Sequence, residues 1–312
     1  MKTISIVTPM YNESGNIPIF FDKINALSFA GCAIEIVVIN DGSRDDTFEQ
    51  LRERLKTQKN LKIVNLARNF GQDAAIWAGV ENATGDAIIV MDADMQDPPE
   101  LLVQMVEKWQ EGYDVVNAHR KNRKSDSLLK RKTAKFYYKT LNRLSPKVKY
   151  PMNVNNFRLI SRRVADVLGT FPSNEKLFRN AVAQAGFKTA TIDFTREKRH
   201  AGKSKFNLGA MIRLSFAGIA DAGVKPLHFA FVWSILFIMA GLGWSGFTMV
   251  AYIMELSIAY TSWFNYLGFL SGVMFFAGII LLTQSINGYY LGKAYTEIKG
   301  RPMYIVEGVY KS

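Results

Sequence analysis

An apolar run that leads directly into acidic side chains is the feature that most constrains how this chain can fold. Residues 88–91 read IIVM, which is typical of a buried strand. The run ends in Asp92 and Asp94, and Asp97 followed by two prolines is typical of a helix start. A strand that ends in acids ahead of a helix predicts a ligand site at the edge of an α/β sheet.

The oxygen atoms of this stretch favour a hard metal ion. Asp92, Asp94 and the amide of Gln96 stand at alternate positions, with no His or Cys nearby. Oxygen ligands of this kind suit Mg²⁺ or Mn²⁺ that carries the phosphates of a substrate. By spacing alone, an acidic loop that merely closes a strand explains the same residues equally well.

The pattern of strand and helix recurs along the first two thirds of the chain. Short apolar runs predict strands at 4–7, 34–39, 62–66, 88–91, 114–118 and 189–194. Segments typical of helices occupy about 15–27, the region between 45 and 56, the region between 72 and 84, and 175–186. This alternation predicts a mostly parallel, Rossmann-like α/β sheet. The chain lacks GxGxxG after the first strand and lacks GxxxxGK[ST], which argues against NAD binding and P-loop chemistry.

Polar clusters follow three of the predicted strands. They are Tyr11-Asn12-Glu13, Asp41-Gly42-Ser43 and Asp92-Ala93-Asp94. Because parallel strands end at the same edge of a sheet, we expect these clusters to lie side by side. Their convergence favours a binding site over a simple acidic loop. Asp41 taken alone also fits a turn or N-cap residue in front of a helix.

The last third of the chain holds two long stretches without charge. No Asp, Glu, Lys or Arg occurs from Pro226 to Met254, and none occurs between Glu255 and Lys293. Because a membrane helix needs roughly 20 apolar residues, transmembrane spans are predicted near 229–253 and 266–289. The alternative, a buried helical hairpin of a soluble protein, is disfavoured by the length of both stretches. Lysine and arginine flank the outer ends, so the positive-inside rule predicts that both termini are cytoplasmic.

Charge and cysteine content indicate which class of partner the chain binds and in which compartment it lies. The formal net charge is +12, and residues 120–149 alone hold twelve Lys or Arg and one acid, Asp126. Beside membrane spans, such a run favours an anionic lipid surface and a phosphorylated lipid over nucleic acid. The N-terminus lacks the apolar core of a signal peptide, and Cys32 is the single cysteine. We therefore expect a multi-pass protein of the inner (plasma) membrane with its catalytic part in the reducing cytoplasm.

Several motifs stand in a fixed order along the chain: SIVTPMYNE, INDGSRDDT, ARNFGQDAAIWAG, DADMQDPPE, NFRLISRR and RHAGKSKF. Together they resemble the family-2 glycosyltransferases of GT-A fold, and among these the polyprenyl-phosphate branch with its bactoprenol glucosyltransferases and dolichol-phosphate mannose synthases. The resemblance covers essentially the whole chain. It implies a GT-A catalytic domain at 1–165, an acceptor-side and juxtamembrane segment at 166–225, two transmembrane helices at 226–292 and a cytoplasmic tail at 293–312.

The resemblance also implies roles for individual residues. The nucleotide-sugar would be bound by Pro9, Tyr11, Glu13, Asp41, Asp92, Arg199, Ser204 and Lys205. The cation, Mg²⁺ or Mn²⁺, would be held by Asp92, Asp94 and Gln96. The acceptor phosphate would meet Arg120, Arg123 and Arg131, because the arginine fork suits phosphate oxygens. The expected catalytic set is Asp94, Arg120, Arg131 and Asn156.

Asn156 departs from the family pattern. Bactoprenol glucosyltransferases usually carry an acid just before FRL as a candidate general base, and an amide cannot take a proton. A phosphate acceptor is already mostly anionic at pH 7, whereas a sugar hydroxyl or water would need a base. Asn156 therefore favours a phosphate acceptor. His119 has no evident partner in the sequence and is interpreted as structural.

The expected activity is the inverting transfer of one sugar from a nucleotide-sugar, UDP-glucose or another UDP-hexose, to undecaprenyl or a similar polyprenyl phosphate at the cytoplasmic membrane face. The product would be a lipid-linked sugar donor for cell-envelope glycosylation. A processive polysaccharide synthase is one alternative, although its QxxRW motif is absent. The other is a non-catalytic membrane scaffold or lipid-carrier translocase, which the intact Asp92, Asp94 and Gln96 argue against. The sugar, the nucleotide and the formation of a homo-oligomer are left open.

Overall fold

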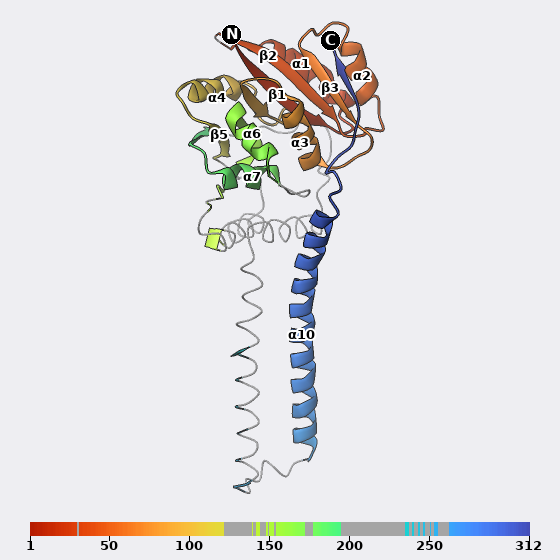
Figure 1. The fold of residues 1–312 in the computed structure, drawn as a ribbon, viewed down its shortest axis with the longest axis vertical. Coiled ribbons are helices and arrows are strands. Elements are labelled where there is room, and N and C mark those ends of the chain that lie inside the picture. Colours follow the sequence, from red (N-terminus) through yellow and green to blue (C-terminus); the bar gives the residue numbers. More distant parts are fainter. Residues whose placement is uncertain are drawn as a thin grey trace. The chain divides into compact units, whose positions relative to one another are not determined.

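The computed structural model describes residues 1–29, 31–121, 150–152, 154–171, 177–194 and 262–312, with isolated residues inside 139–148 and 235–254. The chain divides into two compact units (Figure 1). The first contains Met1–Asp221 and Arg301–Ser312, and the second contains Ala222–Gly300. All residues predicted to form the site belong to the first unit.

The first unit is built on one sheet of eight strands. They are β1 (Lys2–Met10), β2 (Cys32–Asn40), β3 (Leu61–Leu66), β4 (Ala87–Val90), β5 (Val115–Arg120), β6 (Val154–Ser161), β7 (Thr189–Phe194) and β8 (Val306–Lys311). Their order in the sheet is β7-β5-β6-β4-β1-β2-β3-β8. β6 and β8 run antiparallel to their neighbours, and the remaining strands share one direction. The predicted α/β architecture with a mostly parallel sheet is confirmed.

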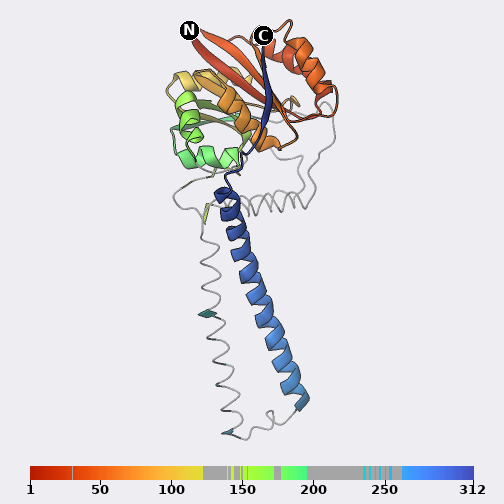
Figure 2. The ribbon, with the colours of Figure 1, turned by 45° about the vertical axis from the view of Figure 1, so that its right-hand side comes forward.

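Helices cover both faces of this sheet (Figures 1 and 2). One face carries α1 (Ile17–Asn25), α2 (Thr47–Arg54) and α4 (Leu101–Gln110). The other face carries α3 (Gln72–Asn82), α6 (Arg162–Gly169) and α7 (Phe178–Ala185). Because β4 is covered on both sides, each of its residues is buried and apolar. The run at 88–91 is thus the buried strand that its composition predicts.

The structure differs from the sequence predictions at four elements. Helix α6 has no counterpart among the predicted helices. Helix α4 begins at Leu101 with Glu100 at its N-cap, so Asp97 does not cap it. β6 and β8 have no counterpart among the predicted strands. β8 alternates between exposed and half-buried residues, so no apolar run marks it. Its strand conformation comes from backbone pairing with the edge of β3.

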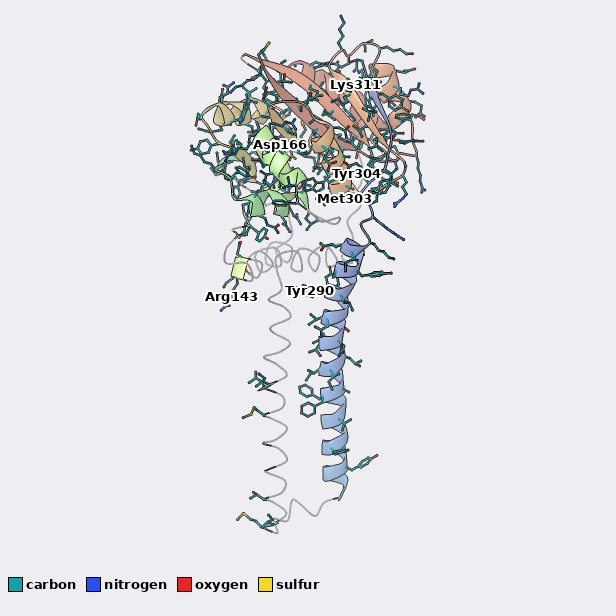
Figure 3. The ribbon with its side chains drawn as sticks, in the orientation of Figure 1. Arg143, Asp166, Tyr290, Met303, Tyr304 and Lys311 are labelled. Carbon is teal, nitrogen blue, oxygen red and sulfur yellow. The ribbon has the colours of Figure 1, made fainter. Side chains whose placement is uncertain are left out.

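The C-terminal tail adds to the sheet through β8. Asn65 of β3 donates from Nδ2 to the Glu307 carboxylate of β8 at 2.7 Å. Tyr304, which precedes β8, donates its hydroxyl hydrogen to Glu81 of α3 (Figure 3). Burial, together with the hydrogen bond and charge of Glu81, raises the pKa of Tyr304. The residues just before β8 are thereby fixed to α3, and β8 itself to β3.

In the second unit the structure describes one long helix, α10 (Ser262–Ile298), of 37 residues. The predicted span at 266–289 falls inside α10, and the span at 229–253 falls mostly outside the described residues. Among the helices that the structure describes, none combines the length and the apolarity required to cross a bilayer. The transmembrane hairpin is therefore not supported by the structure and stays a prediction.

A buried ion pair ties three of the parallel strands together. Lys62 of β3 lies with its Nζ 2.7 Å from Glu35 Oε1 of β2, and the side chains are 8% and 14% exposed. Ser5 of β1 donates from Oγ to the other oxygen of Glu35 at 2.5 Å. Burial acts to raise the pKa of Glu35, but hydrogen bonds from Lys62, Ser5 and Thr84 outweigh it and hold that pKa below its usual 4.5.

We predict that Glu35→Gln lowers the free energy of unfolding by about 3 kcal/mol at neutral pH, because Lys62 stays buried without its counter-charge. The folded pKa of Glu35 lies below the unfolded value. Its contribution is therefore present above pH 4.5 and is lost as the pH falls through the folded pKa. Urea denaturation of the full chain, at neutral pH and in acid, measures the free energy of unfolding of both proteins. The difference between wild type and variant should be smaller in acid.

Lys108→Ala is the matched control, because it removes an exposed ion pair with Glu111. Exposed pairs contribute little, so this variant should unfold like the wild type. If both substitutions lowered the free energy of unfolding equally, burial would not be the reason that the pair of Glu35 and Lys62 stabilises the fold.

Candidate active site

Three loops meet at the edge of the sheet where β1, β2 and β4 end. β1 pairs in parallel with both β2 and β4. Beyond the last paired residues, Asp41 N–H donates to the Met10 carbonyl at 2.9 Å, and Met91 N–H donates to the Val7 carbonyl at 3.1 Å. The polar clusters after these strands therefore lie beside one another, as their positions in the sequence predict.

Side-chain hydrogen bonds lock the loop after β1 to the loop after β2. Asn12 has a φ of +54°, a left-handed conformation that asparagine tolerates better than most residues. Its N–H donates to Ser43 Oγ at 3.0 Å, and its Oδ1 accepts from Arg44 N–H at 2.8 Å. Tyr11 and Glu13, both predicted to bind the nucleotide, flank this locked residue.

Asp41 is buried and holds the loop that follows β3. Its carboxylate accepts hydrogen bonds from Phe70 N–H at 2.7 Å, from Gly71 N–H at 3.0 Å and from Asn69 Nδ2 at 3.0 Å. Burial raises the pKa of Asp41 above its usual value, in spite of these bonds and the charge of Arg68. The structure gives Asp41 an internal positioning role, and its contact with a nucleotide stays a prediction.

Gly42 lets the loop after β2 lie directly against the loop after β3. Its φ is +61°, and a Cβ at this position would lie 2.4 Å from the carbonyl carbon of Arg68 and 2.5 Å from the nitrogen of Asn69. A side chain here would therefore displace the loop that Asp41 holds. Sequence reasoning places Gly42 in the right cluster but does not reveal this close approach.

A cavity of about 510 Å³ lies at this corner of the sheet. The loops after β2 and β3 form its walls, together with the start of α2 and Glu307 of β8. Its charged lining residues are Arg44, Asp45, Glu49, Arg68 and Glu307. Charges of both signs beside asparagine amides suit a polar ligand rather than an apolar one. Glu307 is a lining residue that sequence reasoning missed, because β8 itself was not evident.

The acidic loop follows β4 along the same edge. Asp94 is buried, and its Oδ1 accepts from Gln96 N–H at 3.2 Å across a turn in which Met95 has a φ of +51°. Asp92 is half-buried, and its Oδ1 accepts from Gln72 Nε2 at 2.8 Å, at the start of α3. The turn thus keeps the three predicted metal ligands, Asp92, Asp94 and Gln96, in one short segment.

This turn fits a divalent cation that arrives with a diphosphate. Within the residues that the structure describes, no group of three or more His, Cys, Asp or Glu could enclose a metal ion. Mg²⁺ in proteins is often held by one or two carboxylates, with substrate phosphates and water as further ligands. Asp92 and Asp94 supply two carboxylates and Gln96 an amide oxygen, which suits such an ion.

Strands β6, β5 and β7 form the other half of this edge. His119, near the end of β5, stands opposite Val154 of β6 and Asp193 of β7. Its Nδ1 lies 2.7 Å from Asp193 Oδ1. The sequence alone gives no sign of this partner, because Asp193 is 74 residues away along the chain. The interpretation of His119 as lacking a partner is wrong.

Asn156 lies two residues inside β6, on the neighbouring strand. Its Oδ1 is buried and has no hydrogen-bond partner among the described residues. A buried polar atom without a partner is uncommon and marks a place where a ligand or water completes the bonding. Arg120, predicted to meet the acceptor, ends β5 at the same edge.

Part of the predicted site lies outside the described residues. These residues are Arg123, Arg131, Arg199, Ser204 and Lys205. Their roles stay predictions. Pro9 lies within β1, one residue before the strand ends.

Comparison with known proteins identifies the family. The model of glycosyl transferase family 2 matches residues 5–169. The chain is 36% identical to a prophage bactoprenol glucosyl transferase homolog of Escherichia coli K12, over 99% of each protein. It is 37% identical to an uncharacterized glycosyltransferase of Bacillus subtilis, over 98% of this chain and 94% of the relative.

A solved structure has the same fold. Glucosyl-3-phosphoglycerate synthase of Mycobacterium tuberculosis, solved with Mn²⁺, UDP-glucose and phosphoglyceric acid, aligns with a TM-score of 0.50. The alignment covers 71% of this chain and 79% of that one at 20% identity, so the likeness concerns the fold alone. The family match and the full-length relatives show that the chain is an enzyme, a glycosyltransferase that belongs to family 2.

Proposed function

We propose that this enzyme transfers a single sugar from a nucleotide-sugar to a polyprenyl phosphate, with inversion at the sugar carbon C1. The observation that carries this proposal is the row of polar loops along one edge of the sheet, with the acidic turn at its centre. The name of the Escherichia coli relative, a bactoprenol glucosyl transferase homolog, supports the polyprenyl acceptor.

The donor is proposed to bind over the ends of β1, β2 and β4. Tyr11, Glu13 and the loops held by Asp41 would contact the nucleoside, beside the polar cavity at the same corner. The diphosphate would lie at the acidic turn, where Asp92, Asp94 and Gln96 would hold Mg²⁺ or Mn²⁺. A divalent cation there would neutralise charge that develops on the departing nucleoside diphosphate. UDP-glucose or another UDP-hexose is the proposed donor.

The acceptor phosphate is proposed to approach from the β5 and β6 side, where Arg120 would contact its oxygens. A phosphate oxygen attacks C1 from the face opposite the leaving group, and the electron pair of the broken C1–O bond leaves with the nucleoside diphosphate. Asn156 cannot accept a proton, but its free Oδ1 can receive a hydrogen bond from a sugar hydroxyl. This division places the donor and acceptor on opposite halves of one edge.

The reaction is proposed to take place at the cytoplasmic face of the inner membrane. Large apolar side chains of α10 are exposed, among them Phe269, Leu281 and Leu291. Apolar surface of this extent ordinarily contacts lipid or a partner protein. A lipid acceptor that cannot leave the bilayer would require such contact.

Transfer by the purified full chain tests the proposal. The protein would be supplied with undecaprenyl phosphate in vesicles, Mg²⁺, and radiolabelled UDP-glucose, UDP-galactose or UDP-N-acetylglucosamine in separate reactions. We expect one sugar on each lipid with one of these donors. A polymeric product would favour a processive synthase, and the absence of transfer with every donor would overturn the proposal.

The acidic turn generates a second prediction. Asp94→Asn should lower the rate of transfer about 100-fold or more, because it removes charge stabilisation at the leaving group. Chelation of divalent cations should abolish transfer by the wild type. Calorimetric titration with UDP in the presence of Mg²⁺ should show weakened binding by the variant.

Asp22→Asn serves as the control for this substitution, since its carboxylate lies on α1 and is 78% exposed. It should transfer sugar at the wild-type rate. Because Asp94 is buried, thermal unfolding of both variants separates a lost site from a lost fold. A folded Asp94→Asn variant with full activity would contradict the assigned role.

A further inference from the structure

The pairing of His119 with Asp193 is the strongest feature that the proposed function leaves unused. The two residues stand opposite each other on adjacent parallel strands, with Nδ1 and Oδ1 2.7 Å apart. The carboxylate only accepts hydrogen bonds, so Nδ1 carries the hydrogen and donates it. In the neutral ring Nε2 then holds the lone pair and can accept a proton from a third group.

The pair occupies the acceptor half of the edge. His119 immediately precedes Arg120, and it stands opposite Val154, two residues before Asn156. The pairing of β5 with β6 is irregular between Asn117 and His119. Such a bulge redirects the side chain that follows it and is common beside active sites. The His119 side chain is 31% exposed and that of Asp193 is 53% exposed, so a ligand at this edge can reach the pair.

Two neighbouring polar groups also have unused bonding capacity. Asn117 of β5 is 5% exposed, and its Oδ1 has no hydrogen-bond partner among the described residues. The Oδ1 of Asn156 on β6 is in the same state. Asn156 stands near the start of β6, at the end that carries His119, and Asn117 lies two residues before His119 on β5. Together they indicate a place where a polar ligand completes the bonding.

We propose that His119, held by Asp193, accepts a proton from the acceptor phosphate and thereby keeps it a dianion for attack. This inference rests on the proposed function and adds a residue to it. Histidine is the side chain that changes charge between about pH 5 and 8. The second ionisation of a phosphate monoester has a pKa of about 6. A proton is therefore readily exchanged between the two groups, and the Asp193 carboxylate stabilises the imidazolium that results.

The reaction balances without a further reactant. The monoanionic phosphate ester gives its proton to Nε2 of His119, and one oxygen of the dianion forms the new bond to C1. The bond between C1 and the leaving oxygen breaks, and its electron pair departs with the nucleoside diphosphate. The imidazolium afterwards releases its proton to solvent. No carboxylate base is needed at Asn156.

Within the part of the chain that the structure describes, the charged groups on the strands around the pair are few. The described ionisable residues on β5, its continuation and the adjacent strands are Arg120, Lys121, Arg158 and Asp193. Arginine and lysine keep their charge at neutral and mildly acidic pH, and aspartate ordinarily titrates near pH 4. Helix α4 packs on β5 in the apolar cluster that contains Val116 and Ala118, and its described charged residues near that end of the helix are Glu107 and Lys108.

His119→Asn is the decisive variant. Asparagine can still donate a hydrogen bond to Asp193 but cannot take a proton, so it preserves the structural contact and removes the proposed chemistry. The test measures kcat from pH 5.5 to 8.5, with the full chain, saturating undecaprenyl phosphate in vesicles and a saturating nucleotide-sugar, because kcat follows the ionisation of the enzyme–substrate complex. We expect the acidic limb of the variant's profile to shift to higher pH by about one unit. An imidazolium in contact with the phosphate lowers the phosphate pKa by about that much or more, and the variant lacks it.

The expected loss is therefore about threefold at pH 5.5 and less than about twofold at pH 8.5, where the acceptor is already a dianion. Asp193→Asn should move the acidic limb in the same direction, because the imidazolium loses its counter-charge. Lys108→Ala, which removes an exposed pair on α4, should reproduce the wild-type profile.

The outcomes separate this inference from the proposed function. Equal loss at every pH would show that His119 is structural and would overturn the inference alone. A His119→Asn profile that coincides with the wild type would also overturn it. Absence of transfer by the wild type at every pH would overturn the proposed function and this inference with it.

Discussion

The parallel pairing of β1 with β2 on one side and β4 on the other is the constraint on which the site depends. Parallel strands end at one edge, so pairing in this register brings together loops that are about thirty and fifty residues apart in the chain. The apolar content of β4 requires cover on both faces, which the helices provide. The acidic turn therefore has its backbone anchored in the best-buried part of the molecule. Asp92 and Gln96 are half-buried at this rim, and Asp94 is buried beside them.

The rim is fixed by polar contacts between loops rather than by apolar packing. Asp41 holds three donors of the loop after β3, and Asn12 holds the loop after β2. The cost of burying the Asp41 charge is visible in its raised pKa. Such contacts set the position of each loop, because hydrogen bonds are directional in a way that apolar contacts are not. A residue that the sequence predicts to contact the ligand, such as Asp41, can therefore instead position the residues that do.

The edge divides into two halves with different chemistry. The ends of β1, β2 and β4 carry carboxylates and amides, which suit a nucleotide diphosphate with its cation. The end of β5 and the start of β6 carry His119, Arg120 and Asn156, which suit an anionic acceptor. The antiparallel strand β6 lies between them and joins the two halves. In the proposed reaction, a nucleophile bound at one half would approach a carbon held at the other without either substrate crossing the sheet.

The sequence by itself determined the alternation of strands and helices, the convergence of the three polar clusters and the family, because apolar periodicity and short motifs are local properties. It gave no sign of β8, of Glu307 in the cavity wall or of Asp193 beside His119. β8 is an edge strand whose conformation depends on pairing with β3, and an exposed sequence contains no signal for that pairing. Asp41 illustrates the same limit, since its position was evident but its partners were not. Partners tens to hundreds of residues apart are chosen by strand order and register, and only the tertiary structure decides those, because they follow from how the whole core packs.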